Sequence, residues 1–153
     1  PQNLYDKPGN LFVAGFIGSP MINFIDVQLD ESGGAWMLGS LRCALPPRLQ
    51  PAAAPASGRP LVLGIRPEDM VFSREAIPDS LPARAVVREP LGKEALLLLA
   101  ADALPAGSLL RAITQPALRP APDETLWLHF PPARIHLFDA DTAQALPSST
   151  PSY

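Results

Sequence analysis

The chain has 153 residues, of which 47% are hydrophobic and 18% charged, and its formal net charge is −3. Twelve lysines and arginines spread thinly along an acidic chain do not make the basic surface that a polyphosphate backbone requires, so we expect no nucleic-acid partner. The 20 prolines favour short strands and stiff loops over long helices, and Cys43, as the single cysteine, cannot form an internal disulfide.

The start of the chain leads to a further expectation. The sequence opens at Pro1 rather than at a methionine, and it has neither the charged and apolar segments of a secretion signal nor a run of roughly 18 apolar residues that could span a membrane. We therefore expect a fragment of a longer cytoplasmic protein that reaches a membrane only through a partner.

A short helix is expected near the N-terminus. Asn10 is a favourable N-cap, and residues 11–17 carry no charge. Gly18 suits the left-handed residue that follows a helix, and Pro20 prevents continuation. The helix would be apolar nearly all round, so either the sheet of its own domain or another domain has to cover it.

The remaining sequence has the pattern of short strands. From Phe24 to Asp30 apolar and polar residues alternate, which is the period of a half-buried strand. Further strands are expected at residues 35–38, 41–45, 61–65, 70–72, 83–89, 94–99, 109–114, 125–130 and 135–138. Because turn residues separate nearly all of them, the predicted fold is mainly β, either a small barrel or two apposed barrel-like sheets.

Two segments are expected to lie outside this fold. Residues 46–60 are rich in proline and alanine and have almost nothing to bury, which predicts a mobile surface loop or internal linker. Residues 147–153 are polar and are expected to form a disordered tail.

Residues capable of catalysis or metal binding are few and scattered. His129 and His136 have no ligand cluster around them, and Cys43 lacks the signature of a nucleophile, so we expect ordinary histidines and a buried thiol. Asp139 and Asp141 lack the glycine and glutamate of a calcium loop and are expected to bond local backbone. With no Gly-Lys-Ser/Thr phosphate loop either, we expect no catalytic, cofactor-binding or metal-binding residue in this chain.

Residues 64–69 (GIRPED) leave two interpretations open. The segment is either the end of a strand, in which Arg66 pairs with Glu68 or Asp69, or a contact with another subunit.

A second open question concerns Arg84 and Arg88, which are expected to share one face of a strand. They would then either form a solvated face or contribute to a site for an anion.

Four segments, in chain order, resemble a known family. Residues 4–24, 64–69, 89–94 (EPLGKE) and 130–139 (FPPARIHLFD) are similar to segments of the ATP-binding subunits of sugar-type ABC importers, the maltose and glycerol-3-phosphate importer group. The sequence of the first is LYDKPGNLFVAGFIGSPMINF. Lys93 departs from the small residue usual in the family.

The resemblance implies an OB-like domain of the TOBE type over residues 21–146, entered through a junction at residues 1–20 from a missing nucleotide-binding domain. It implies a regulatory and dimerisation role in the uptake of a carbohydrate or glycerol phosphate. The implied partners are a second ATP-binding subunit, the missing domain and, through it, permease subunits at the inner face of the cell membrane. ATP and Mg²⁺ would bind in the missing domain, so this fragment would not hydrolyse ATP.

The family motifs also imply candidate interface or regulatory residues, which are Arg66, Glu68, Asp69, Glu89, Leu91, Gly92 and Phe138. Related TOBE domains in molybdate-type systems bind small oxyanions, which is the alternative function. Its candidate anion contacts are Arg84, Arg88 and Lys93.

Overall fold

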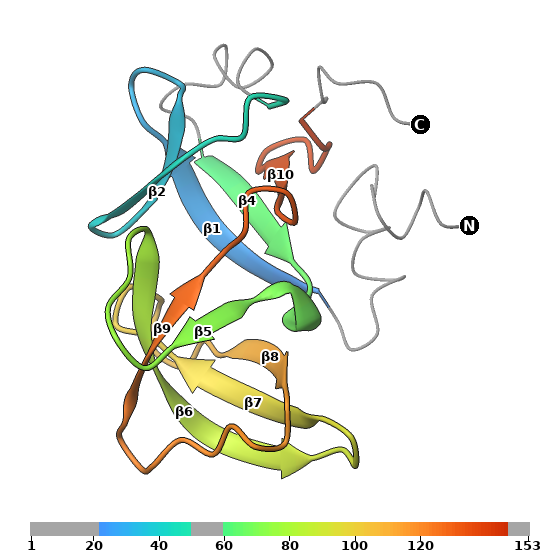
Figure 1. Cartoon of the computed structure of the whole chain (residues 1–153). Coiled ribbons are helices and arrows are strands. Elements are labelled where there is room, and N and C mark those ends of the chain that lie inside the picture. The colour runs from blue at the N-terminus through green and yellow to red at the C-terminus, as the bar shows by residue number, and fades with distance from the viewer. Residues whose placement is uncertain (1–21, 50–59, 147–153) are drawn as a thin grey trace. The chain divides into compact units, whose positions relative to one another are not determined.

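The computed structural model describes residues 22–49 and 60–146. The expected helix at residues 11–17, the junction 1–20, residues 50–59 of the expected loop and the tail 147–153 lie outside the described residues. The chain divides into two compact units, one holding residues up to 65 and from 132 onward, and the other holding residues 66–131. Each unit contains one five-stranded antiparallel sheet (Figure 1).

The first unit combines strands from both ends of the described chain. They are β1 (Asn23–Leu29), β2 (Ala35–Leu38), β3 (Leu41–Ala44), β4 (Pro60–Ile65) and β10 (His136–Asp139), in the spatial order β10-β4-β1-β2-β3. Along β1, Ile25, Val27 and Leu29 are buried, whereas the residues between them are exposed. The predicted alternation is confirmed, and it places one face of β1 against the core.

Gly64 of β4 lies where several apolar side chains of the first unit meet. It pairs with Phe24 of β1 on one side and with His136 of β10 on the other. Phe138 is fully buried, and its ring packs edge-to-face on Phe24 with the ring centroids 6.3 Å apart. A Cβ atom at Gly64 would meet Phe138, Ile22 and Phe24, so a side chain at this position of the GIRPED segment would crowd the ring of Phe138.

The turn between β1 and β2 is organised by Asp30. Its Oδ1 atom accepts hydrogen bonds from Ser32 Oγ (2.8 Å) and from the Gly34 N–H (3.2 Å), and its Oδ2 atom accepts from Nη2 of Arg42 (2.6 Å). The hydrogen bond from Ser32, followed by that from Arg42, holds the pKa of the Asp30 carboxyl below its ordinary value. Asp30 therefore links the turn to β3.

The described start of the stretch 46–60 is not a loose loop. Leu49 is only 2% exposed. Nη2 of Arg48 donates to the carbonyl oxygens of Pro132 (2.8 Å) and Ile135 (3.2 Å). The prediction that this stretch has almost nothing to bury is wrong here, because one leucine enters the core and one arginine satisfies two backbone carbonyls.

The second unit contains a short 3₁₀ turn and the other five strands. They are η2 (Pro67–Asp69), β5 (Val71–Ser73), β6 (Ser80–Pro90), β7 (Ala95–Ala100), β8 (Leu110–Thr114) and β9 (Thr125–His129), with the strands in the order β5-β9-β6-β7-β8. One face of this sheet is buried through Leu81, Ala83, Leu97, Leu99, Leu126 and Leu128. The turn η2 packs against β8.

Strand β6 begins three residues earlier than the sequence predicts, in spite of Pro82. Pro82 pairs with Trp127 of β9, whereas pairing with β7 begins only at Arg84. Because proline cannot donate to a ladder, it is tolerated where a strand has a neighbour on one side only.

The predicted fold class is confirmed: the chain is mainly β, with two curled sheets. Each expected strand is present in the described residues, and most of their ends shift by one residue. In the same residues, no helix is long and apolar enough to cross a membrane.

Candidate functional site

Strand β6 contains a bulge that the sequence did not predict. Ala85 pairs with Leu99 of β7, and the next pair is Val87 with Leu98, which leaves Val86 as an extra residue. An extra residue bends the strand and shifts the alternation of side chains beyond it.

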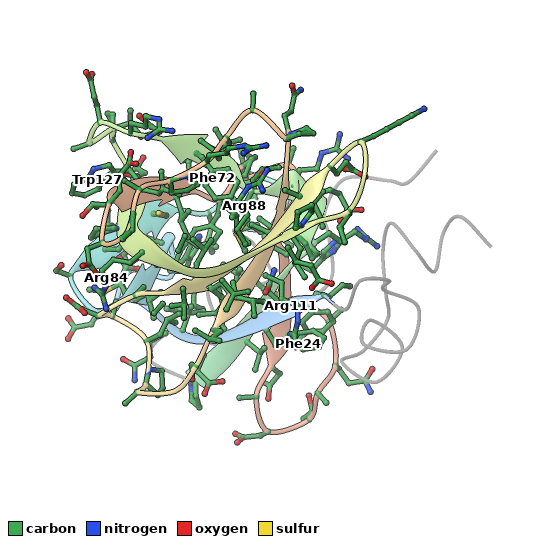
Figure 2. The ribbon with its side chains drawn as sticks, turned by 90° about the horizontal axis from the view of Figure 1, so that it is seen from below. Phe24, Phe72, Arg84, Arg88, Arg111 and Trp127 are labelled. Atoms are coloured by element: carbon green, nitrogen blue, oxygen red, sulfur yellow. The ribbon has the colours of Figure 1, made fainter. Side chains whose placement is uncertain are left out.

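The bulge separates Arg84 from Arg88. Arg84 lies opposite Ala100 and Arg88 opposite Leu97, and these two positions face opposite sides of β7. The prediction that the two arginines share one strand face is therefore wrong, because one of the residues between them is the extra residue of the bulge. Figure 2 shows the two side chains apart from each other.

A groove follows the edge of β6 beyond the bulge. Pairing with β9 ends where Arg84 meets Thr125, so in the described part of the chain no strand lies beside residues 85–90 on that side. Residues 84–88 and residues 120–123 instead line a groove of about 450 Å³. Both arginines line it because it follows the edge of the strand and not one face.

Each arginine of the groove already has a partner. Arg84 Nη1 lies 3.2 Å from Oδ1 of Asp102, in an ion pair whose side chains are 44% and 91% exposed. Arg88 donates from Nη2 to the carbonyl oxygen of Pro116 (2.9 Å) and from Nε to that of Leu118 (3.4 Å). Arg88 thus ties β6 to the segment after β8, while the Arg84 pair is open to solvent.

The wall of the groove opposite β6 is held by Glu124. Its Oε1 atom accepts a hydrogen bond from the Ala121 N–H (2.9 Å), its own N–H donates to the Ala121 carbonyl (3.1 Å), and its Oε2 atom pairs with Arg74. The bond from Ala121 and then the bond from Arg74 hold the pKa of Glu124 below its ordinary value. Glu124 therefore ties the wall to itself at Ala121 and to Arg74.

The β6 side of the groove presents two exposed apolar side chains. Val86 is 58% exposed and Val87 is 46% exposed. Val86 lies at the bulge and Val87 directly after it, so the apolar surface coincides with the part of β6 that β9 does not cover.

The GIRPED segment crosses the boundary between the two units: Gly64 and Ile65 end β4 of the first unit, and the second unit begins at Arg66. Arg66 is 6% exposed, and its carbonyl accepts the Asp69 N–H (3.0 Å) at the turn η2. Glu68 is exposed, whereas Asp69 is half-buried. Of these three candidate interface residues, Glu68 presents the most surface to a partner.

The EPLGKE segment forms the turn between β6 and β7. The Leu91 N–H donates to the Glu94 carbonyl (2.8 Å), and Gly92 has a φ of 84°, a left-handed conformation that glycine adopts without strain. Leu91 is 49% exposed, and Glu89 and Lys93 are also exposed. With Glu94, which is exposed as well, this segment carries three charged side chains and the apolar Leu91 where a partner can reach them.

The candidate interface residues are not all brought together. Phe138 belongs to the first unit and is fully buried, whereas the other six candidates lie in the second unit. The observed contacts of Phe138 are those of a core residue.

The remaining candidates have ordinary structural surroundings. The His129 Nδ1 atom lies 3.3 Å from the carbonyl oxygen of Asp79, and Cys43 is a buried free thiol as predicted. Asp139 accepts the Asp141 N–H (2.8 Å), so the prediction that this segment bonds its own backbone is confirmed. Among the residues described, no group of three or more His, Cys, Asp or Glu could hold a metal ion.

Sequence reasoning missed the groove, although one signal for it was present. The adjacent apolar residues Val86 and Val87 interrupt the alternation of β6, which is typical of a bulge. No local signal brings residues 120–123 to this strand, because that approach depends on the path of the chain between β8 and β9.

Comparison with protein families gives two adjoining matches. The family model described as the MalK OB fold domain matches residues 18–70, and the model described as the TOBE domain matches residues 63–138. Together the two models cover residues 18–138 without a gap.

Curated relatives agree with these matches. The sn-glycerol-3-phosphate import ATP-binding protein UgpC of Escherichia coli O157:H7 is 36% identical over 150 residues, and that of Salmonella paratyphi A (strain ATCC 9150 / SARB42) is 38% identical over 151 residues. Each alignment covers 94% of this chain and 38% of the relative. The chain therefore spans less than two fifths of the length of these relatives.

A solved structure also resembles the chain. It is the cytoplasmic molybdate-binding protein ModG with molybdate bound, which matches with a TM-score of 0.57 and 14% identity over 75% of this chain and 94% of ModG. At this identity the likeness concerns the fold alone. The adjoining family matches and the alignments to import ATP-binding proteins show that the chain belongs to the MalK-type OB-fold and TOBE domain family found in ABC importer ATP-binding subunits.

Proposed function

We propose that the chain is the regulatory and dimerisation part of an ABC importer ATP-binding subunit that energises uptake of a carbohydrate or glycerol phosphate. The observation that carries the proposal is the alignment of 94% of the chain with proteins named for glycerol-3-phosphate import. The two family models support the same assignment, because they divide the chain into the OB-fold and TOBE parts of one importer subunit.

ATP hydrolysis belongs, in this proposal, to a part of the subunit outside this chain. The relatives are more than twice as long as the segment that matches, and this sequence has no Gly-Lys-Ser/Thr phosphate loop. The proposed partners are a second copy of the subunit, its nucleotide-binding domain and, through that domain, the permease subunits. The subunit would then work on the cytoplasmic side of the membrane.

The experiment that tests dimerisation uses a chimera. Residues 21–146 replace the matching segment of the E. coli relative, and sedimentation velocity and cross-linking compare the chimera with a truncated relative that lacks the segment. We expect stronger self-association of the chimera. Equal self-association of the two proteins would contradict the proposal.

A matched pair of variants locates the contact. Leu91 and Leu109 are both exposed leucines of the second unit, at 49% and 40%, but only Leu91 lies in a family motif. Leu91→Glu in the chimera is expected to weaken self-association about tenfold, and Leu109→Glu to leave it within about twofold. Equal effects of the two substitutions would exclude the EPLGKE turn as the contact.

A further inference from the structure

Among residues 22–49 and 60–146, which the structure describes, residues 85–90 of β6 have a sheet partner on one side only. They pair with β7, and pairing with β9 stops at Arg84. An unpaired strand edge presents backbone N–H and C=O groups that an extended segment of another protein can use for main-chain hydrogen bonds. Edges of this kind are usually shielded by charge or by a covering loop.

The segment 120–123 stands across from this edge without pairing to it. It leaves a groove of about 450 Å³ between itself and β6. Two of its four residues, Pro120 and Pro122, have no N–H to offer. An inserted segment would therefore take most of its backbone hydrogen bonds from β6, with the proline rings as an apolar wall.

The wall of the groove is held by the interactions of Glu124. The Glu124 carboxylate accepts a hydrogen bond from the Ala121 N–H, and the Glu124 N–H donates to the Ala121 carbonyl. The carboxylate also pairs with Arg74. When a groove is already formed, its wall does not have to become ordered as the segment binds. Part of the entropic cost of binding is thereby avoided.

Side chains along the groove indicate the chemistry of the segment. Val86 and Val87 expose apolar surface that alternate side chains of an added strand can cover. Arg84 and Arg88 contribute two cations to the lining, where Asp123 is the one carboxylate, and Asp102 pairs with Arg84 from outside the lining. Exposed apolar groups beside a cation whose present partner is open to solvent match an extended segment with apolar residues and at least one carboxylate.

Arg84 is the cation that can receive this carboxylate. Its present partner, the Asp102 side chain, is 91% exposed, and ion pairs this open to solvent contribute little to stability because water screens them. An incoming carboxylate can therefore displace Asp102 at little cost. Arg88 stays bonded to the carbonyls of Pro116 and Leu118.

We propose that the groove beside residues 85–90 binds an extended acidic segment of a partner protein by strand addition to β6. The inference deepens the proposed regulatory function and rests on it for the partner's role, since it names the kind of segment that a regulatory partner would present. The binding itself is a property of the second unit.

The probe is a peptide selected on the complete 153-residue chain from a displayed library of random ten-residue sequences. Selected sequences are expected to have an apolar residue at every second position and to contain aspartate or glutamate. On binding a synthetic selected peptide, the amides of residues 85–90 are expected to become protected from hydrogen exchange. Selection of carboxylate-free sequences, protection elsewhere, or no enrichment would overturn the proposal.

Three substitutions sharpen the test. Val87→Glu is expected to weaken peptide binding about tenfold or more, whereas Val71→Glu, a change at a valine of the same 46% exposure on β5, should leave it within about twofold. Asp102→Asn removes the competing carboxylate and should tighten binding about two- to fivefold. Equal weakening by both valine variants, or weaker binding by Asp102→Asn, would contradict the groove as the site.

The two proposals fail in different experiments. Peptide binding with the expected variant pattern, combined with a chimera that does not self-associate, would keep the groove and remove the importer role. A chimera that associates, combined with a chain that selects no acidic peptide, would remove the groove and keep the importer role.

Discussion

The ring of Phe138 lies over Gly64, and a Cβ atom added to Gly64 would stand 3.2 Å from the Cε2 atom of that ring. The same added atom would be 3.6 Å from Cγ2 of Ile22 and from Cε1 of Phe24. Gly64 and Phe138 belong to two different family motifs that are far apart in the sequence. A side chain at position 64 would therefore crowd the ring of Phe138.

Gly64→Ala is expected to destabilise the first unit by about 1–3 kcal/mol, because the new methyl group overpacks a fully buried ring. Denaturant unfolding in a Trp127→Phe background measures this, since buried Trp36 then reports on the first unit. Gly34→Ala is the control, because an added Cβ there meets only Ser32 Oγ at 3.4 Å. Equal effects of the two alanines would refute the packing argument.

Phe138→Leu combined with Gly64→Ala tests the contact directly. The smaller side chain makes room for the new methyl group, so the double variant is expected to be more stable than the sum of the two single changes predicts, by about 0.5–2 kcal/mol. The same unfolding measurement provides the double-mutant cycle. Simple additivity would show that the two residues do not restrict each other.

Phe138→Ala is expected to cost about 3–5 kcal/mol, because it empties a fully buried aromatic position. The hydrogen-exchange protection of β4 and β10 amides should fall with it, while that of β7 amides in the other sheet should change less. A loss below about 1 kcal/mol would mean that Phe138 is not a core residue and would reopen its role at an interface.

The groove wall is expected to loosen at acid pH. The pKa of Glu124 is held below its ordinary value, so its ionised form stabilises the folded state. This contribution is fully present above the ordinary glutamate pKa of about 4.3 and is lost as the pH falls through the lower pKa of the folded state. Carbon-detected NMR of the Glu124 carboxyl and stability measured from pH 7 to pH 3 check both statements.

The Glu124→Gln variant should lose less stability than the unchanged protein when the pH falls from 7 to 3. The Glu75→Gln variant, changed at an exposed glutamate outside the wall, should lose as much as the unchanged protein. A Glu124 carboxyl that titrates at or above the ordinary value would contradict the hydrogen bonds assigned to the wall.

Titration with small oxyanions is expected to be flat. A small anion would need both arginines at once, but Arg88 is bonded to two carbonyls, and the bulge turns Arg84 and Arg88 to opposite faces of the strand. Calorimetry with molybdate, sulfate and glycerol phosphate tests this expectation. A saturable heat that disappears in Arg84→Gln would instead support the oxyanion function and its proposed contacts, which include Lys93.

Strand positions were predictable because they depend on local patterns. The alternation of residues 24–30 and the turn residues between later segments indicated the strands of both sheets. The bulge at Val86, the contact between Arg48 and Pro132, and the approach of residues 120–123 to β6 were not predictable in this way. Each depends on segments that meet only after the chain has folded, so no local period records it.

Uptake by the chimera tests the central claim most directly. Cells that lack their own glycerol-3-phosphate import ATP-binding protein would carry either the E. coli relative with residues 21–146 in place of its matching segment or the truncated relative without that segment. We predict that the chimera restores glycerol-3-phosphate uptake above the level of the truncated protein at equal abundance. Uptake no higher than that of the truncated protein, from a chimera that still hydrolyses ATP, would contradict the assignment of this chain to an importer subunit.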